Sequence, residues 1–165
     1  MAIVNFYHLN TINIYLALAK LLDKALSQEQ KILVRTDSTR VAEEIDEFLW
    51  SYDLPSFIPH SKVGDKNFKM SPIYITDEKN NPNNAEILFI ISTPKLSLEE
   101  ILTFKRTFIL FSNNDLEILN LIERFWLELE NPEVKRSYWV QEKKRMGTEV
   151  LQLKVLTFLG SLFFD

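Results

Sequence analysis

The sequence predicts one α/β domain of the three-layer α/β/α sandwich class, with a mostly parallel central sheet. Short apolar runs alternate with stretches of helical periodicity, which is typical of parallel strands joined by helical crossovers. The length of 165 residues is close to the usual size of a single domain. No internal repeat, low-complexity tract or linker divides the chain.

Two strand–helix units are predicted in the first third of the chain. Apolar runs rich in β-branched and aromatic residues predict the strands, and apolar residues at helical spacing predict the helices. The strands span 2–7 and 31–36, and the helices span 11–27 and 38–51. Asn10 and Thr11 are the candidate caps of the first helix, and Asp37 or Ser38 of the second.

A long loop is predicted over 52–71, where Pro55 and Gly64 interrupt any regular pattern. Two strands follow, over 72–76 and 85–92, separated by the turn-rich DEKNNPNN and by no helix. This pair is either a hairpin or one central strand with an edge strand.

The remaining residues up to 141 restore the alternation. A short helix, a strand, a longer helix and a late strand are predicted over 96–102, 106–111, 114–130 and 133–141. The buried centre of the sheet is expected to hold 2–7, 31–36, 85–91 and 106–110, because these runs are apolar on both faces.

The last stretch, TEVLQLKVLTFLGSLFFD (148–165), is rich in apolar residues at helical spacing. Its length and Lys154 argue against a membrane span. We therefore expect a single domain over 1–147 and an apolar C-terminal extension over 148–165 that packs on it as a helix or strand. The alternative is a docking segment for a partner or for a second copy of the chain.

Cysteine and glycine counts argue against most enzyme classes. There are no cysteines, which excludes disulfides, thiol catalysis and a Cys-based zinc site. The three glycines, Gly64, Gly147 and Gly160, match neither G-x-G-x-x-G nor a P-loop. We expect no catalytic residue, no metal and no cofactor.

The net charge of −4 opposes direct binding to nucleic acid. Phosphate backbones are held by broad basic surfaces, which this acidic chain lacks. The N-terminus MAIVNFYHLN has neither a basic nor an apolar signal region, so we expect a cytoplasmic protein with no membrane contact.

The two histidines and the acidic run at 43–47 are expected to have structural or solvated roles. His8 and His60 lack the H-x-x-x-H or H-E-x-x-H spacing of a metal site. The acidic residues lie opposite the apolar stripe of their helix, so they predict a solvated face rather than a pair of catalytic carboxylates.

Two tryptophans lie off the apolar stripes of their helices. Trp50 is nine residues after Val41, which places it 180° from the stripe of the second helix. It must be covered by the following loop, which supplies Phe57, or be offered to a partner. Trp126 lies at the edge of the apolar arc of the late helix.

Several motifs in order resemble the DNA polymerase III chi subunit family. Trp50 closes the second helix, and Phe57 follows seven residues later in a Phe-x-Pro-His run. FYHL (6–9), PIYIT (72–76), NPNNAEILFI (81–90) and YWVQ (138–141) resemble the alphaproteobacterial form of the family. The resemblance covers about residues 3–141.

The resemblance implies a Rossmann-like α/β/α fold and a non-catalytic accessory subunit of the replicase. Family members link the clamp loader to single-stranded DNA-binding protein by holding its acidic C-terminal peptide, which ends in a Pro-Phe carboxylate. The resemblance implies that Trp50, Phe57 and Trp126 border the groove for this peptide. A clamp-loader or psi-like subunit is the second implied partner. The resemblance implies contact with DNA only through these partners.

The basic residues of the family's late helix are replaced here. The two positions expected to meet the peptide carboxylate fall at Leu119 and Glu123, and Arg124 is the nearest candidate cation.

Two other function classes stay open at this point. One is a nucleotide- or phosphate-binding α/β enzyme, which the missing glycine loops disfavour. The other is direct binding of single-stranded nucleic acid through aromatic side chains, which the acidic charge disfavours.

Overall fold

The computed structural model describes residues 1–10, 12–52, 57–93, 95–112, 115–141 and 153–156. The strands in this part of the chain are β1 (Ala2–Leu9), β2 (Ile32–Arg35), β3 (His60–Lys62), β4 (Ile73–Thr76), β5 (Ile87–Ile91), β6 (Arg106–Ser112), β7 (Val134–Gln141) and β8 (Leu153–Leu156). The helices are α1 (Ile14–Leu26), α2 (Thr39–Ser51), α3 (Leu98–Leu102) and α4 (Leu116–Glu128), with a 3₁₀ turn at Phe68–Met70.

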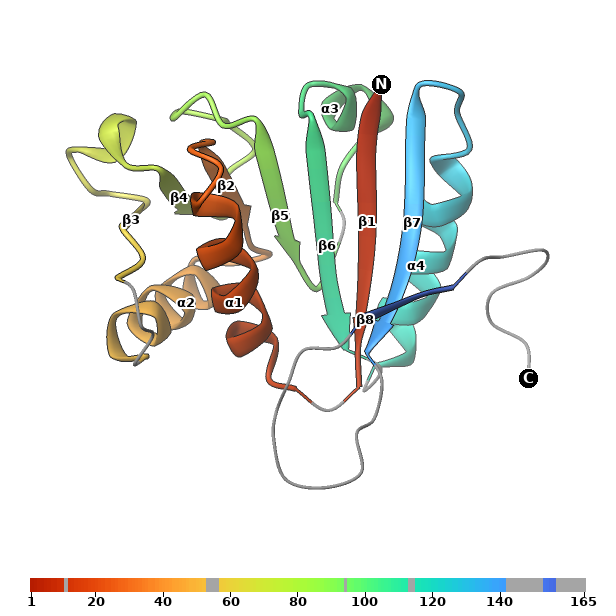
Figure 1. Cartoon of the computed structure of the whole chain (residues 1–165), viewed down its shortest axis with the longest axis horizontal. Helices are drawn as coiled ribbons and strands as arrows, with labels where there is room; N and C mark the ends of the chain where they lie inside the picture. Colours follow the sequence, from red (N-terminus) through yellow and green to blue (C-terminus); the bar gives the residue numbers. More distant parts are fainter. Residues whose placement is uncertain (11, 53–56, 94, 113–114, 142–152, 157–165) are drawn as a thin grey trace.

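The strands form one sheet in the order β3-β4-β2-β5-β6-β1-β7-β8. Every neighbouring pair from β3 to β7 is parallel, and β8 joins β7 in the antiparallel direction. Helices α1 and α2 cover one face of the sheet, and α4 lies behind the other face (Figure 1). The predicted α/β/α sandwich with a mostly parallel sheet is confirmed.

Side-chain alternation along the strands divides the core between the two faces. In β2, Ile32 and Val34 pack with α1 and α2, whereas Leu33 packs on the face that α3 and α4 cover. In β1, Phe6 contacts Phe125 of α4, with ring centroids 6.3 Å apart. Burial on both faces explains why these strands are continuous apolar runs rather than alternating ones.

Helix α1 begins later than the sequence predicts, because Asn13 is its cap. The Oδ1 atom of Asn13 accepts from the backbone N–H groups of Tyr15 at 2.8 Å and Leu16 at 3.4 Å. Asn10 instead donates from its Nδ2 to the Gln141 carbonyl oxygen at 2.8 Å, and so ties the end of β1 to the end of β7. Ser38, one of the two predicted caps, is the N-cap of α2.

Strands β4 and β5 are not a hairpin, and β4 is not an edge strand. Both are parallel to β2, which lies between them, and β3 lies outside β4. The connection over 77–86 therefore has to return from the carboxyl ends of the strands to their amino ends. It runs alongside β2: the Lys79 carbonyl accepts from Arg35, and Asn83 Nδ2 donates to the Ile32 carbonyl at 3.1 Å.

Hydrogen bonds from an asparagine side chain to the backbone allow this connection to take the place of a crossover helix. The side chain of Asn81 accepts from the Ala85 N–H at 2.8 Å and donates to the Ala85 carbonyl at 3.0 Å. Side-chain amides thereby satisfy backbone groups that a helix would have satisfied internally. The pattern DEKNNPNN predicts a turn, but the direction of the next strand depends on what lies beside it.

Strand β3 and the 3₁₀ turn lie inside the predicted 52–71 loop. Because β3 is only three residues long and polar, HSK, no period-2 pattern reveals it. Of the C-terminal extension, Leu153–Leu156 forms β8, and the rest of 148–165 lies outside the described residues. The division into 1–147 and 148–165 therefore stays a prediction.

The return connection provides a test of the fold. We expect Asn83→Ala to lower the free energy of unfolding by about 1–2 kcal/mol, because it removes a buried hydrogen bond to the end of β2. Asn80→Ala is the matched control, since Asn80 is exposed in the same connection, and its effect should stay within about 0.5 kcal/mol. Urea unfolding measures both, and equal effects would contradict the role assigned to Asn83.

Candidate functional site

The structure does not bring the four sequence-predicted site residues together. Trp50 and Phe57 lie together at the end of α2, whereas Arg124 and Trp126 lie on α4. Helices α2 and α4 pack on opposite faces of the sheet. The prediction of one groove bordered by Trp50, Phe57 and Trp126 is therefore wrong in its geometry.

The aromatic pair, Trp50 and Phe57, stands out from the protein surface. Trp50 is 62% exposed and Phe57 is 65% exposed, and their ring centroids are 5.4 Å apart. The exposure of Trp50 confirms the wheel argument that puts it opposite the buried face of α2. Two large adjacent rings left in solvent are typical of a binding surface.

His60 holds the aromatic pair in place from below. Its side chain is buried, and its Nδ1–H donates to the Ile58 carbonyl at 2.7 Å. Its Nε2 atom lies 3.3 Å from Asp46 Oδ1, and its ring contacts Trp50 with centroids 5.2 Å apart. His60 thus joins the loop before β3 to helix α2, which is the structural role that the sequence predicts.

The aromatic pair has acidic surroundings. Asp46 and Glu47 are four and three residues before Trp50, so they share its side of α2, and Glu43 lies one turn further back. Lys62 Nζ, 3.3 Å from Asp46 Oδ2, is the neighbouring cation. Its hydrogen bond to Asp46 raises the pKa of the Lys62 amine above its usual value.

The second surface is a trough between α4 and the loops that precede and follow β5. This α4 trough has a volume of about 450 Å³. Its lining residues are Leu121, Arg124, Phe125 and Glu128 from α4, Lys95, Leu96 and Ser97 from the loop before α3, and Lys79 from the β4–β5 connection. Three cationic side chains and one carboxylate therefore surround a floor that contains leucine and phenylalanine.

Trp126 is not part of the α4 trough. It is two residues beyond Arg124, which turns it about 200° around the helix. Its ring packs edge-on against Phe6 at 5.2 Å and lies beneath the Arg136 guanidinium, 4.5 Å from the centroid. Arg136 also donates to the Trp126 carbonyl, so Trp126 is held against the sheet.

Lys79 and Lys95 are functional candidates that the sequence alone does not reveal. They come from two connections that are far from α4 in the sequence. They meet Arg124 because the connections after β4 and β5 return over the face of the sheet that α4 covers. No local sequence pattern indicates this meeting.

His8 has a structural role as well. Its Nδ1 is 3.0 Å from the Tyr138 hydroxyl, and its ring stacks on Phe111 with centroids 5.0 Å apart. Burial lowers the pKa of His8 below its ordinary value of 6.5.

The described residues contain neither a candidate metal site nor a candidate membrane-spanning helix. Within them, no three or more histidine, aspartate or glutamate side chains are grouped to hold a metal ion. None of the helices in the same ranges is long and apolar enough to cross a membrane.

Comparison with known proteins gives a consistent result. The family model for DNA polymerase III chi subunit, HolC, matches residues 1–128. A protein of Rickettsia prowazekii (strain Madrid E), named probable DNA polymerase III subunit chi, is 34% identical over 111 residues. That alignment covers 64% of this chain and 67% of the relative. The family match ends with α4, and so it includes both candidate surfaces.

The exposure of the aromatic pair predicts how the surface responds to truncation. Trp50→Ala and Phe57→Ala should each change the free energy of unfolding by about 1 kcal/mol or less, because both rings are mostly in solvent. His60→Ala should cost about 2 kcal/mol or more, because it empties a buried site and removes the bond to Ile58. Thermal and urea unfolding would check this order, and a Trp50→Ala protein that fails to fold would show that the ring belongs to the core.

Proposed function

Since the chain belongs to the DNA polymerase III chi subunit family, an accessory subunit of the polymerase, we propose that it links the clamp loader to single-stranded DNA-binding protein. In this role it holds the acidic C-terminal peptide of that protein on one surface and a clamp-loader or psi-like subunit on another. The observation that carries the proposal is the pairing of a cationic, apolar-floored trough with a separate exposed aromatic pair.

The α4 trough is the better fit for the acidic peptide. A peptide that ends in a Pro-Phe carboxylate needs cations for its charges and an apolar floor for its last ring. Arg124 offers a planar guanidinium that can bind a carboxylate through two hydrogen bonds. Lys79 and Lys95 add positive charge along the same trough, and Phe125 and Leu121 contribute to its apolar floor.

The aromatic pair is a poor fit for an acidic ligand. Asp46, Glu47 and Glu43 lie on the same side of α2 as Trp50, and like charges brought together in an interface oppose binding. We therefore assign Trp50 and Phe57 to the clamp-loader or psi-like partner, for which two large exposed rings are typical anchors.

The positions of the two surfaces support a bridging role. The aromatic pair lies at the end of α2, and the α4 trough lies over the opposite face of the sheet. Partners bound at these two places would not compete for the same residues. A single rigid domain would then connect them directly.

Leu119 and Glu123 make Arg124 the central cation of the proposed peptide site. Leu119 is half-buried and packs on the α4 side of the core, so it cannot meet a carboxylate. Arg124 is exposed and lines the trough. With one arginine and two lysines in place of a denser basic helix, we expect a modest affinity.

We propose further that the subunit has no polymerase, nuclease or ATPase activity of its own. The described residues offer no metal-holding group, and the sequence has no glycine-rich phosphate loop. The net charge of −4 supports contact with DNA only through partners. As a subunit of the replicase it would work in the cytoplasm.

The peptide site can be tested by titration with a synthetic acidic peptide that ends in Pro-Phe. We expect Arg124→Gln to weaken binding about tenfold, because a charge-assisted hydrogen bond is worth about 1.5–3 kcal/mol. Trp50→Ala should change the affinity less than about twofold. Raising the salt concentration should weaken binding to the parent protein, because the contacts are partly exposed. If Trp50→Ala weakens peptide binding more than Arg124→Gln does, the peptide site lies at the aromatic pair and not in the α4 trough.

The second surface is tested by co-expression with the clamp-loader subunits of the same organism. Trp50→Ala combined with Phe57→Ala should remove most of the co-purifying clamp loader, because aromatic anchors typically cost about 2 kcal/mol or more on truncation. Arg124→Gln should leave this complex intact. Retention of the full complex by the double variant would contradict the assignment.

A further inference from the structure

A second cavity, the Arg35 crevice, opens at the carboxyl ends of β2, β4 and β5. Its volume is about 180 Å³. Arg35 is the last residue of β2, and Thr36, Thr93 and Lys95 lie in the loops around the opening. In open parallel sheets, ligands typically bind outside the carboxyl ends of the strands, where this crevice lies.

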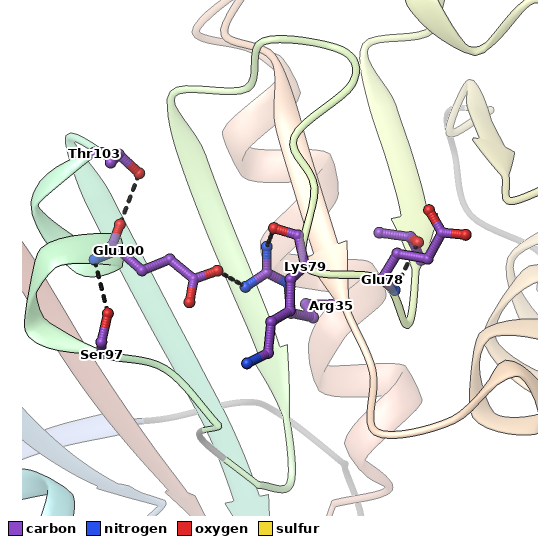
Figure 2. A network of polar contacts seen from close by, with 7 residues as sticks. Arg35, Glu78, Lys79, Ser97, Glu100 and Thr103 are labelled. Carbon is purple, nitrogen blue, oxygen red and sulfur yellow. Dashed lines mark hydrogen bonds and ion pairs between the residues drawn. The ribbon is translucent and has the colours of Figure 1, made fainter.

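Arg35 is a buried cation with an unused hydrogen-bond donor. The residue is only 7% exposed. Its Nη1 group is paired with Glu100 of α3, and its Nη2 group donates to the Lys79 carbonyl at 3.1 Å (Figure 2). The buried Nε–H has no hydrogen-bond partner among the described residues. An orphaned donor on a buried charge is costly, which indicates that an acceptor can bind there.

The Arg35 crevice adjoins the α4 trough. Lys79, Lys95 and Leu96 line both cavities, so the two form one path over this edge of the sheet. The path has an apolar part near Phe125 and a buried cation at its other end. An extended peptide with an apolar end and preceding acidic residues matches this order of chemistry.

We propose that the Arg35 crevice receives an acidic side chain of the same partner peptide, upstream of its apolar end, and that Glu100 is the resident carboxylate with which it competes. This inference rests on the proposed function, because it extends the peptide site of the α4 trough. The incoming carboxylate accepts from Arg35 Nε–H, and Lys95 and Lys79 stand at the mouth.

The ligand is a carboxylate rather than a phosphate. Asp37 and Asp77 also line the crevice, and Asp77 accepts from the Thr39 hydroxyl at 2.7 Å. These carboxylates would repel a phosphate dianion more strongly than a single carboxylate. None of the glycines that let a backbone approach a phosphate lies at these strand ends, since the chain's glycines are Gly64, Gly147 and Gly160.

The backbone of Glu100 is held by hydrogen bonds on both sides of the residue. Its backbone N–H donates to the Ser97 hydroxyl at 3.3 Å, and its carbonyl accepts from the Thr103 hydroxyl at 2.7 Å (Figure 2). The side chain reaches from this anchored turn to Arg35 and neutralises it. Removing the charge of Glu100 while keeping its hydrogen-bonding shape should therefore strengthen binding of an outside carboxylate.

The experiment compares two peptides and three proteins by isothermal titration. Both peptides end in Pro-Phe with a free carboxylate, and one has upstream aspartates where the other has asparagines. The proteins are the parent, Glu100→Gln and Glu99→Gln. Glu99 is the matched control because it is exposed, is one residue away and changes the net charge equally.

We expect Glu100→Gln to bind the aspartate peptide about fivefold more tightly than the parent, with less than a twofold change for the asparagine peptide. Glu99→Gln should change the affinity for either peptide by less than about twofold. Equal effects of the two variants, or no gain with Glu100→Gln, would overturn the inference while leaving the α4 trough site intact. If neither peptide binds the parent protein, the proposed function fails and this inference fails with it.

A surface variant keeps the test decisive if Glu100→Gln does not fold. Lys79→Gln changes an exposed side chain at the shared mouth. It should weaken binding of the aspartate peptide about two- to fivefold more than binding of the asparagine peptide. Lys66 is exposed elsewhere on the surface, so Lys66→Gln should affect the two affinities equally. Equal loss for both peptides with Lys79→Gln would overturn the inference.

Discussion

Burial of a parallel sheet on both faces is the constraint on which the rest of this structure depends. Parallel strands must each be followed by a return connection, and every return path covers one face of the sheet. Between β1 and β3 those paths are the helices α1 and α2, and between β5 and β7 they are α3 and α4. Between β4 and β5 the return is an extended segment, in which the Asn81 side chain bonds the backbone of Ala85 and the Asn83 side chain bonds the Ile32 carbonyl of β2.

The same constraint gathers the candidate binding residues. All strands from β1 to β7 point the same way, so the loops after β2, β4 and β5 open at one edge. Arg35, Lys79 and Lys95 meet there, and α4 brings Arg124 beside them. The missing crossover helix is relevant here, since the extended 77–86 segment supplies both the Lys79 side chain and the carbonyl that holds Arg35.

The two candidate surfaces differ in local charge, although the aromatic residues alone suggested a single site. The aromatic pair lies beside the carboxylates of α2, whereas the α4 trough has three cations against one carboxylate. A protein of net charge −4 can hold an acidic peptide only where its cations are locally concentrated. The family assignment and this local charge pattern are the two observations that support the proposed adaptor role.

The sequence by itself determined the fold class, most elements and the position of Trp50 opposite the buried stripe of its helix, because apolar periodicity and caps are local properties of the chain. It also indicated the family, through residues such as Trp50 and Phe57 at their characteristic spacing. Tertiary structure decided which strands are neighbours, because β4 and β5 pair with β2 rather than with each other. It likewise decided that Trp126 packs against Phe6 and that Arg35, Lys79 and Arg124 lie along one path. These outcomes depend on contacts between residues far apart in sequence, and no local pattern specifies the partner of a buried ring or cation.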